Sequence, residues 1–339
     1  MSFLLSEAEV RLRNNKLLAM GSLIDWGLVV LAIGDLGRSG IGPNGYDIVG
    51  MVKGLILQSW YSLSDSGLEE SLRIRLDFMY FTGFDGAVPD ETTICRFRNL
   101  LVRNGGQEKI FTEVNRQLQA HNLQVKATQG AVLDASLVKS AARPRPPIVE
   151  GVPVSGDEKS FEIQQESKKV SADPDATWLK KGNKYHFGYQ VFATVSEDGG
   201  AIVKIHTTPA NESEIVNLKA AITGVECAKL LADKGFASKE NRAHLRTNGI
   251  KTRIMYKAHK NQPLTQRQKN YNKAVSKTRY IVEQAFGTLK RKFNFAQTPY
   301  FTTEKTNAWA HLKATAFNML KAVNQIININ QPNKNLITN

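Results

Sequence analysis

The spacing of apolar residues changes near residue 125, and this change constrains the fold more than any other feature of the sequence. Up to that point apolar residues recur every three or four positions, which is typical of helices. Beyond it, short apolar runs rich in β-branched residues favour strands. The chain is therefore expected to have a helical N-terminal domain at residues 1–125, with helices over residues 17–36, 47–63, 68–81, 91–103 and 108–123.

The second part reads as a mixed α/β domain over residues 126–328, followed by a polar tail at 329–339. A Pro-, Ser- and Lys-rich stretch at about 140–181 predicts a long loop insertion. The first three strands predict an antiparallel meander, and the later alternation with helices favours parallel strands. This is the element order of the ribonuclease H-like fold. The expected strands are 130–137, 184–195, 201–208, 227–232 and 250–255, and the expected helices are 213–221, 239–247, 277–293 and 306–327.

The charge balance points to a polyanionic partner. Lys and Arg number 45 against 31 Asp and Glu, which gives a net charge of +14. A field of that size attracts nucleic acid, although a basic protein without such a role is the alternative. Only Cys95 and Cys227 are present, so neither a disulfide scaffold nor a zinc site is indicated. With no signal-peptide pattern and an apolar stretch at 23–36 that is broken by Asp and Gly, we expect a cytoplasmic protein without a membrane span.

Two aspartates occupy positions where a carboxylate needs an explanation. Asp134 lies inside the apolar run 130–137, where an unpaired charge is expensive to bury unless it is paired or binds a cation. Asp233 directly follows the expected strand 227–232, and catalytic groups in α/β sheets gather at such strand ends. Each alone has a simpler interpretation as a surface residue in a salt bridge.

Glu283 is the third acid, and its surroundings are unusual. It is the only acidic residue from 250 through 295, a stretch that holds twelve Lys and Arg. Arg279, Glu283 and Lys290 follow i, i+4, i+11 spacing and share one helix face. The spacing therefore places this carboxylate beside two cations that can hold phosphates, and Arg291 extends the basic segment. The simpler alternative is a solvated Arg–Glu pair that stabilises the helix by a few tenths of a kcal/mol.

Three carboxylates match the needs of phosphodiester chemistry. Cleavage by two Mg²⁺ ions about 3.5–4 Å apart uses one ion to activate the nucleophile and the other to stabilise the leaving oxygen. Mg²⁺ prefers oxygen ligands and keeps several waters, so a few carboxylates hold the pair. Asp134, Asp233 and Glu283 are thus the expected catalytic and metal-binding residues, with Mn²⁺ as a substitute ion. In the helical part, Arg96 and Arg98 on the expected helix 91–103 are candidate DNA contacts, or else the basic face of an ordinary bundle helix.

The sequence resembles the DDE transposases of bacterial insertion sequences, specifically the insertion-sequence-5 group. The resemblance covers almost the whole chain and is carried most specifically by VLDAS around Asp134, ADKGFAS around Asp233 and RYIVEQAFGTLKR around Glu283. It implies that these three acids form a metal-binding triad and that Arg279 and Lys290 are the basic positions flanking the glutamate. The family motif often has a tyrosine three residues before the arginine, whereas this chain has Ser276.

These observations predict an enzyme that binds the terminal inverted repeats of its element, frees 3′-OH ends and joins them to target DNA. Double-stranded DNA is the expected partner, the synaptic complex is expected to contain a homodimer, and the protein is expected to associate with the nucleoid. Two alternatives stay open at this point. One is a nuclease of the same fold without strand transfer, and the other is a DNA-binding regulator derived from a transposase that no longer cuts.

Overall fold

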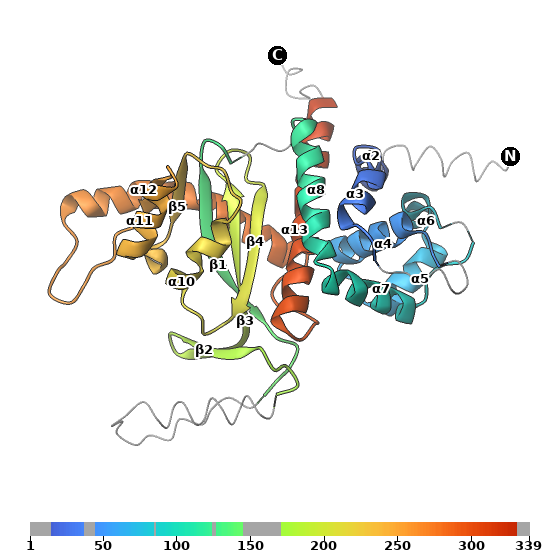
Figure 1. Ribbon diagram of the computed structural model, residues 1–339, viewed down its shortest axis with the longest axis horizontal. Coiled ribbons are helices and arrows are strands. Elements are labelled where there is room, and N and C mark those ends of the chain that lie inside the picture. Colours follow the sequence, from blue (N-terminus) through green and yellow to red (C-terminus); the bar gives the residue numbers. More distant parts are fainter. Residues whose placement is uncertain (1–14, 37–44, 85, 124–126, 145–170, 331–339) are drawn as a thin grey trace, which may run out of the picture. The chain divides into compact units, whose positions relative to one another are not determined.

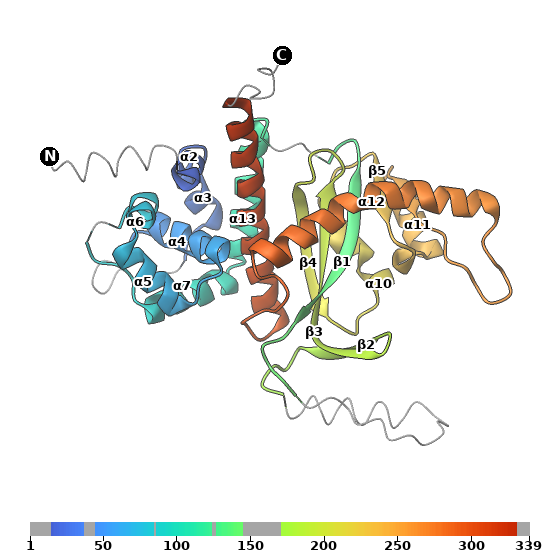
Figure 2. The ribbon, with the colours of Figure 1, turned by 180° about the vertical axis from the view of Figure 1, so that it is seen from behind.

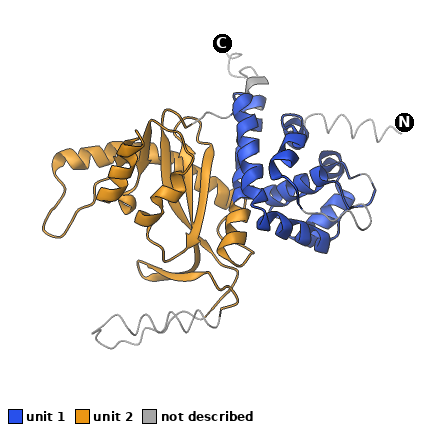
Figure 3. Ribbon diagram, viewed as in Figure 1, with its two compact units in different colours: residues 1–125, 311–339 blue, residues 126–310 orange. Residues whose placement is uncertain are grey.

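The computed structural model describes residues 15–36, 45–84, 86–123, 127–144 and 171–330. The chain divides into two compact units (Figure 3). Unit 1 combines Met1–Val125 with His311–Asn339, and unit 2 is Lys126–Ala310.

Every described element of the first 123 residues is a helix, and polar side chains fix where several of these helices begin. Asp47, Ser64 and Asp90 each accept a hydrogen bond from the backbone N–H three residues ahead, which is standard N-capping. The helices are α2 (Lys16–Gly21), α3 (Trp26–Ile33), α4 (Ile48–Tyr61), α5 (Asp65–Ile74), α6 (Leu76–Thr82), α7 (Glu91–Arg103) and α8 (Gly106–Ala120).

Two of the expected N-terminal helices are in fact broken. The single helix expected over 17–36 is split into α2 and α3, because the Asp25 side chain accepts from Leu28 N–H and starts a new helix there. The helix expected over 68–81 is split at Arg75, whose backbone is extended while its guanidinium binds Asp77. In both places a local side-chain interaction interrupts the helix. The spacing of apolar residues does not predict such an interruption.

The C-terminal helix corrects the expected domain boundary. The sequence predicted that the α/β domain runs to residue 328, but the chain from His311 onward belongs to unit 1. The reason is packing, since Leu312, Met319, Ala322 and Val323 of α13 (Thr303–Asn330) are buried in the hydrophobic core of the N-terminal helices. Unit 1 is therefore built from both ends of the sequence.

Unit 2 is built around one mixed sheet (Figures 1 and 2). The long strand β3 pairs antiparallel with β1, β2 and β4, whereas β5 pairs parallel with both β1 and β6. This is the expected combination of an antiparallel meander with a parallel extension. The strands are β1 (Ala131–Lys139), β2 (Thr177–Lys181), β3 (Lys184–Ser196), β4 (Ile202–Pro209), β5 (Lys229–Ala232) and β6 (Lys251–Ile254).

Helices cover both faces of this sheet. On one face, α10 (Glu214–Ile222) and α11 (Lys239–Thr247) share an apolar core with the inward residues Ala131 and Leu133 of β1. On the other face lies α12 (Gln266–Lys292), which contacts β1, β3 and β5 and reaches Asp134. Since successive strand residues point to opposite faces, Asp134 is turned toward α12.

Two segments of unit 2 differ from the expected elements. Residues 177–181 form β2, although they fall in the predicted loop insertion. Residues 145–170 of that insertion lie outside the described residues. The turn Gly182-Asn183, with Gly182 at φ +62°, joins β2 to β3 as a two-residue hairpin. Helix α12 begins eleven residues earlier than expected, because Thr265 and Gln268 form a capping box.

Both cysteines, Cys95 and Cys227, are free thiols. Within the described ranges, no helix has both the length and the apolar composition that crossing a membrane requires.

One buried lysine in unit 1 makes stability depend on pH. Lys313 donates to Ser59 O (2.9 Å) and Ser62 Oγ (3.1 Å), and burial lowers the pKa of its ammonium group from 10.5 to about 8. Below about pH 8 the native state carries a desolvated charge. Between that value and 10.5 the unfolded chain holds a proton that the native state lacks, so the free energy of unfolding rises with pH.

We therefore predict that Lys313→Met removes the charge-burial cost that lowers the free energy of unfolding near pH 7. The substitution also flattens the rise in the free energy of unfolding between pH 8 and 10.5. Urea unfolding across this pH range measures both effects. Lys305→Met, on an exposed side chain of the same helix, is the control. An unchanged pH dependence in Lys313→Met contradicts the assignment.

Candidate functional site

Strand register brings two of the three predicted carboxylates together. In the parallel pair β1–β5, Leu133 lies opposite Ala232. Asp134 and Asp233 are the next residues along the chain from this pair, so their backbones lie side by side. Asp134 is a residue within β1, whereas Asp233 directly follows the last residue of β5.

The chain after Asp233 is fixed by a short helical turn. Residues Lys234–Phe236 form a 3₁₀ turn, and the Asp233 carboxylate accepts from Lys234 N–H at 2.7 Å. Phe236 is fully buried and contacts Phe192 edge to face, with ring centroids 6.1 Å apart. This aromatic contact anchors the turn that follows Asp233 in the core of unit 2.

Arg279 of α12 binds both aspartates. Its Nη2 donates to Asp134 Oδ2 at 2.9 Å, and its Nη1 lies 3.4 Å from Asp233 Oδ1. The arginine side chain is 12% exposed and the Asp134 side chain 19% exposed, so this ion pair is largely removed from water. Arg279 was predicted to hold DNA phosphates, but in this structure its guanidinium is occupied by the two acids.

The electrostatics of this group favour a further cation. Burial raises the pKa of the Asp134 carboxyl, with a further rise from Asp233, and Arg279 lowers it only in part. The Arg279 Nε is buried and has no hydrogen-bond partner among the described residues. Burial and the charge of Asp233 thus disfavour the ionised form of Asp134, and a bound cation would favour that form.

Glu283 lies on α12 one turn after Arg279, and its side chain is exposed. Lys290, further along the helix, is close enough to Asp134 that the carboxylate raises the pKa of the lysine, although burial and Lys181 together lower it more. Glu283 thus stands between two residues of one helix face that both interact with Asp134. Even so, no three acidic, His or Cys side chains of the described residues are grouped as a metal cluster.

A stripe of apolar residues packs this helix against the sheet. Val282, Phe286 and Leu289 are buried against the sheet, and Phe293 is buried just past the end of the helix. Arg291 is exposed, as a phosphate contact would need to be.

A fourth carboxylate at the site was missed by the sequence analysis. Glu214, the first residue of α10, accepts from Gln190 Nε2 at 3.3 Å. Burial raises the pKa of Glu214, and the charges of Asp134 and Asp233 raise it further. Gly235 leaves room for it, because a Cβ at that position would come within 1.8 Å of Glu214 Oε2. In the sequence Glu214 looks like an ordinary acid in the first turn of a helix, so only the contact with the Asp233 turn identifies it.

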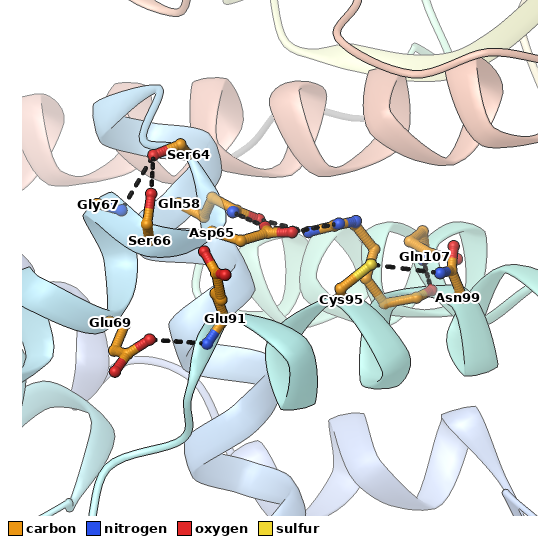
Figure 4. A network of polar contacts seen from close by, with 11 residues as sticks. Gln58, Ser64, Asp65, Ser66, Gly67, Glu69, Glu91, Cys95, Asn99 and Gln107 are labelled. Carbon is orange, nitrogen blue, oxygen red and sulfur yellow. Dashed lines mark hydrogen bonds and ion pairs between the residues drawn. The ribbon is translucent and has the colours of Figure 1, made fainter.

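The two arginines predicted on α7 have different surroundings. Arg96 is exposed, whereas Arg98 is only 8% exposed and its Nη2 donates to Asp65 Oδ2 at 2.7 Å. Burial alone would raise the pKa of Asp65, but hydrogen bonds from Arg98 and Gln58 lower it. Asp65 and Gln58 lie together in the polar network of Figure 4. The prediction that Arg98 contacts DNA is therefore wrong for this structure, because its guanidinium joins α7 to α5 inside unit 1.

Comparison with known proteins identifies the family. A family model described as "Transposase DDE domain" matches residues 127–319, which is more than half of the chain. The chain belongs to the DDE transposases. A second model, described as "Transposase domain (DUF772)", matches residues 6–100.

A curated relative supports the same family. The transposase for insertion sequence element IS1106 of Neisseria meningitidis serogroup B is 37% identical over 237 residues, covering 68% of this chain and 78% of the relative. This chain is thus a bacterial insertion-sequence transposase of the DDE type. The finer placement in the insertion-sequence-5 group stays a prediction.

Two solved structures are similar at low sequence identity. One is a cryo-EM structure of the piggyBac transposase synaptic complex with hairpin DNA, with a TM-score of 0.42 and 10% identity, covering 92% of this chain and 73% of that chain. The other is a crystal structure of the Mos1 strand transfer complex, with a TM-score of 0.25 and 13% identity, covering 86% and 81%.

The contrast between Arg98 and Arg96 predicts a large effect on stability for one substitution and almost none for the other. Arg98→Ala leaves Asp65 without its cation in a mostly buried site, which costs about 3 kcal/mol of unfolding free energy. Arg96→Ala removes an exposed side chain and changes stability by less than about 0.5 kcal/mol. Thermal melts of the two variants measure the difference, and equal melting temperatures contradict the structural role of Arg98.

Proposed function

We propose that this transposase binds the terminal inverted repeats of its element, cleaves phosphodiester bonds to expose 3′-OH ends, and joins those ends to target DNA. The observation that carries the proposal is the pair Asp134 and Asp233, which neighbouring parallel strands set side by side against α12. Family membership supports strand cleavage and transfer, and the residue roles are our proposal.

The donor set fits Mg²⁺. Asp134 and Asp233 offer oxygen ligands, Glu283 lies on the helix face that contacts Asp134, and the cost of keeping Asp134 ionised is relieved by a bound cation. When bound, a pair of Mg²⁺ or Mn²⁺ ions would activate the attacking water or 3′-OH and stabilise the leaving oxygen. Asp134 and Asp233 would hold the ions from the sheet, and Glu283 would complete the set from α12.

The basic residues have separate roles in this proposal. Arg279 orients the two aspartates, and Lys290 and Arg291 contact phosphates next to the cleaved bond. Arg96 is the candidate DNA contact in unit 1, which we propose binds the element ends and forms the homodimer. Unit 2 has β1 at the centre of a sheet with order β4-β3-β1-β5-β6, which supports assignment to the ribonuclease H-like fold.

The decisive experiment uses the purified full chain and DNA that carries the element ends. With Mg²⁺ or Mn²⁺ the wild type is expected to nick this DNA and give target-joined products on a gel. Asp233→Asn and Glu283→Gln are each expected to lower cleavage by at least about 10³-fold, because each removes a ligand charge from the ions. Both variants should still bind DNA.

Other outcomes of the same assay separate the alternatives. Cleavage without joined products indicates a nuclease, and DNA binding without any cleavage indicates a regulator. Cleavage that survives in a chelator, or in Asp233→Asn, overturns the metal mechanism.

The fourth carboxylate leads to a graded prediction. Glu214 adds negative charge near Asp134 and Asp233, so Glu214→Gln should weaken ion binding without removing a ligand. We expect the Mg²⁺ concentration for half-maximal cleavage to rise on the order of tenfold while the maximal rate falls much less. Glu212→Gln, two residues earlier and exposed, is the control. A loss of maximal rate at saturating Mg²⁺ as large as that of Asp233→Asn contradicts this secondary role.

A further inference from the structure

The first half of α12 carries a concentration of positive charge that the site described above does not use. Between Glu240 and Glu283 the sequence has no acidic residue. The first buried residue of α12 is Val275, so the residues Gln266–Ala274 extend about 13 Å before the helix meets the core. Figures 1 and 2 both show this end of α12, with the loop before it, projecting from the sheet of unit 2.

Exposed residues form a continuous line along this helix. Lys269, Lys273 and Lys277 follow four-residue spacing, and the same side continues to Arg291 near the end of the helix. We call this line the basic stripe. Its exposed members are Lys269, Lys273, Lys277, Tyr280, Gln284 and Arg291.

The basic stripe borders the face that holds Arg279, Glu283 and Lys290. At 100° per residue, the two lines lie about a quarter of a turn apart around the helix. The residues Val275, Val282 and Phe286 on the far side of that face are buried. The basic stripe is therefore the solvent-facing surface of α12 next to the Asp134–Asp233 site.

Helix stability does not explain these lysines. Like charges at i, i+4 destabilise a helix by a few tenths of a kcal/mol per pair. Lys269, Lys273 and Lys277 form no ion pair with any residue in the described part of the chain. Repulsion between lysines that have no acidic partner in the protein is expected where an external anion binds them.

The projecting segment is nevertheless held in place by specific contacts. Asn272 bonds both backbone groups of Tyr256, accepting from N–H at 2.8 Å and donating to the carbonyl at 3.0 Å. The rings of Tyr256 and Tyr271 lie 5.1 Å apart, and the Arg242 guanidinium is 5.0 Å from the Tyr256 ring centre. These contacts fasten the loop to the helix, so the lysines are presented on an ordered support.

We infer that the basic stripe binds the sugar-phosphate backbone of double-stranded DNA that continues beyond the cleaved bond. The position of this DNA rests on the proposed function, which places the cleaved bond at the carboxylates. The basic stripe is a contact surface separate from the carboxylate site. Lysines on a helix contact phosphates as point charges without reading bases, so the contact should be independent of sequence.

The test is binding of the full-length chain to fluorescein-labelled duplexes over a range of salt concentrations. The variant Lys269→Gln/Lys273→Gln/Lys277→Gln is expected to lower the slope of log K against log salt by about 3, and to raise Kd at about 0.1 M salt at least tenfold. The control variant Lys219→Gln/Lys239→Gln/Arg246→Gln removes the same charge from exposed positions of α10 and α11 on the opposite face, and should change the slope much less. A triple Lys→Arg variant of the stripe keeps the charge and should restore binding.

The outcomes separate this inference from the proposed function. Two duplexes are used, one with the element ends and one of random sequence, and an equal loss on both supports a backbone contact. A loss confined to one duplex, or a slope equal to that of the control variant, overturns the inference. If the wild type does not cleave but the stripe variant still lowers the slope on both duplexes, the proposed function fails and the stripe stands.

Discussion

Arg279 is the residue on which the arrangement of unit 2 depends. Two carboxylates on neighbouring parallel strands repel each other, and burial makes the ionised forms still less favourable. A guanidinium that reaches both, at 2.9 Å and 3.4 Å, offsets part of that cost and connects α12 to β1 and to the end of β5. The same contact fixes the rotation of α12 about its axis. That rotation decides which residues of the helix face the sheet, the site and the solvent.

Much of this arrangement follows from sequence because it depends on regular periodicities. The alternation of strand residues, the strand-end position of Asp233 and the four-residue spacing of Arg279 and Glu283 are all visible in the chain. The apolar stripe of α12 is also visible in the chain, and the structure buries it. Periodicity predicts which residues share one face of a helix, however, and it does not predict what that face contacts. Arg279 was therefore expected to meet phosphates, whereas it meets two aspartates.

The remaining errors come from contacts between residues distant in sequence. Glu214 approaches the Asp233 turn only because α10 packs near that strand end, and nothing in its local sequence distinguishes it from a helix-starting acid. The burial of Arg98 could have been predicted from the sequence. Arg98 follows Ile94 by four residues and precedes Leu101 by three, so its own helix places it on the buried face, where Asp65 meets it.

The contribution of α13 to unit 1 has a consequence for how the protein is made. Residues 1–125 leave the ribosome first, but the core that they form with Leu312 and Met319 cannot close until the last helix is synthesised. At ordinary translation rates that delay is about 10–40 s. During this interval the apolar helix faces that pack against Leu312 and Met319 in the finished core lack that partner. A chain that ends before His311 lacks the residues that complete this core, so truncation of the last helix exposes the apolar faces of helices near the other end of the sequence.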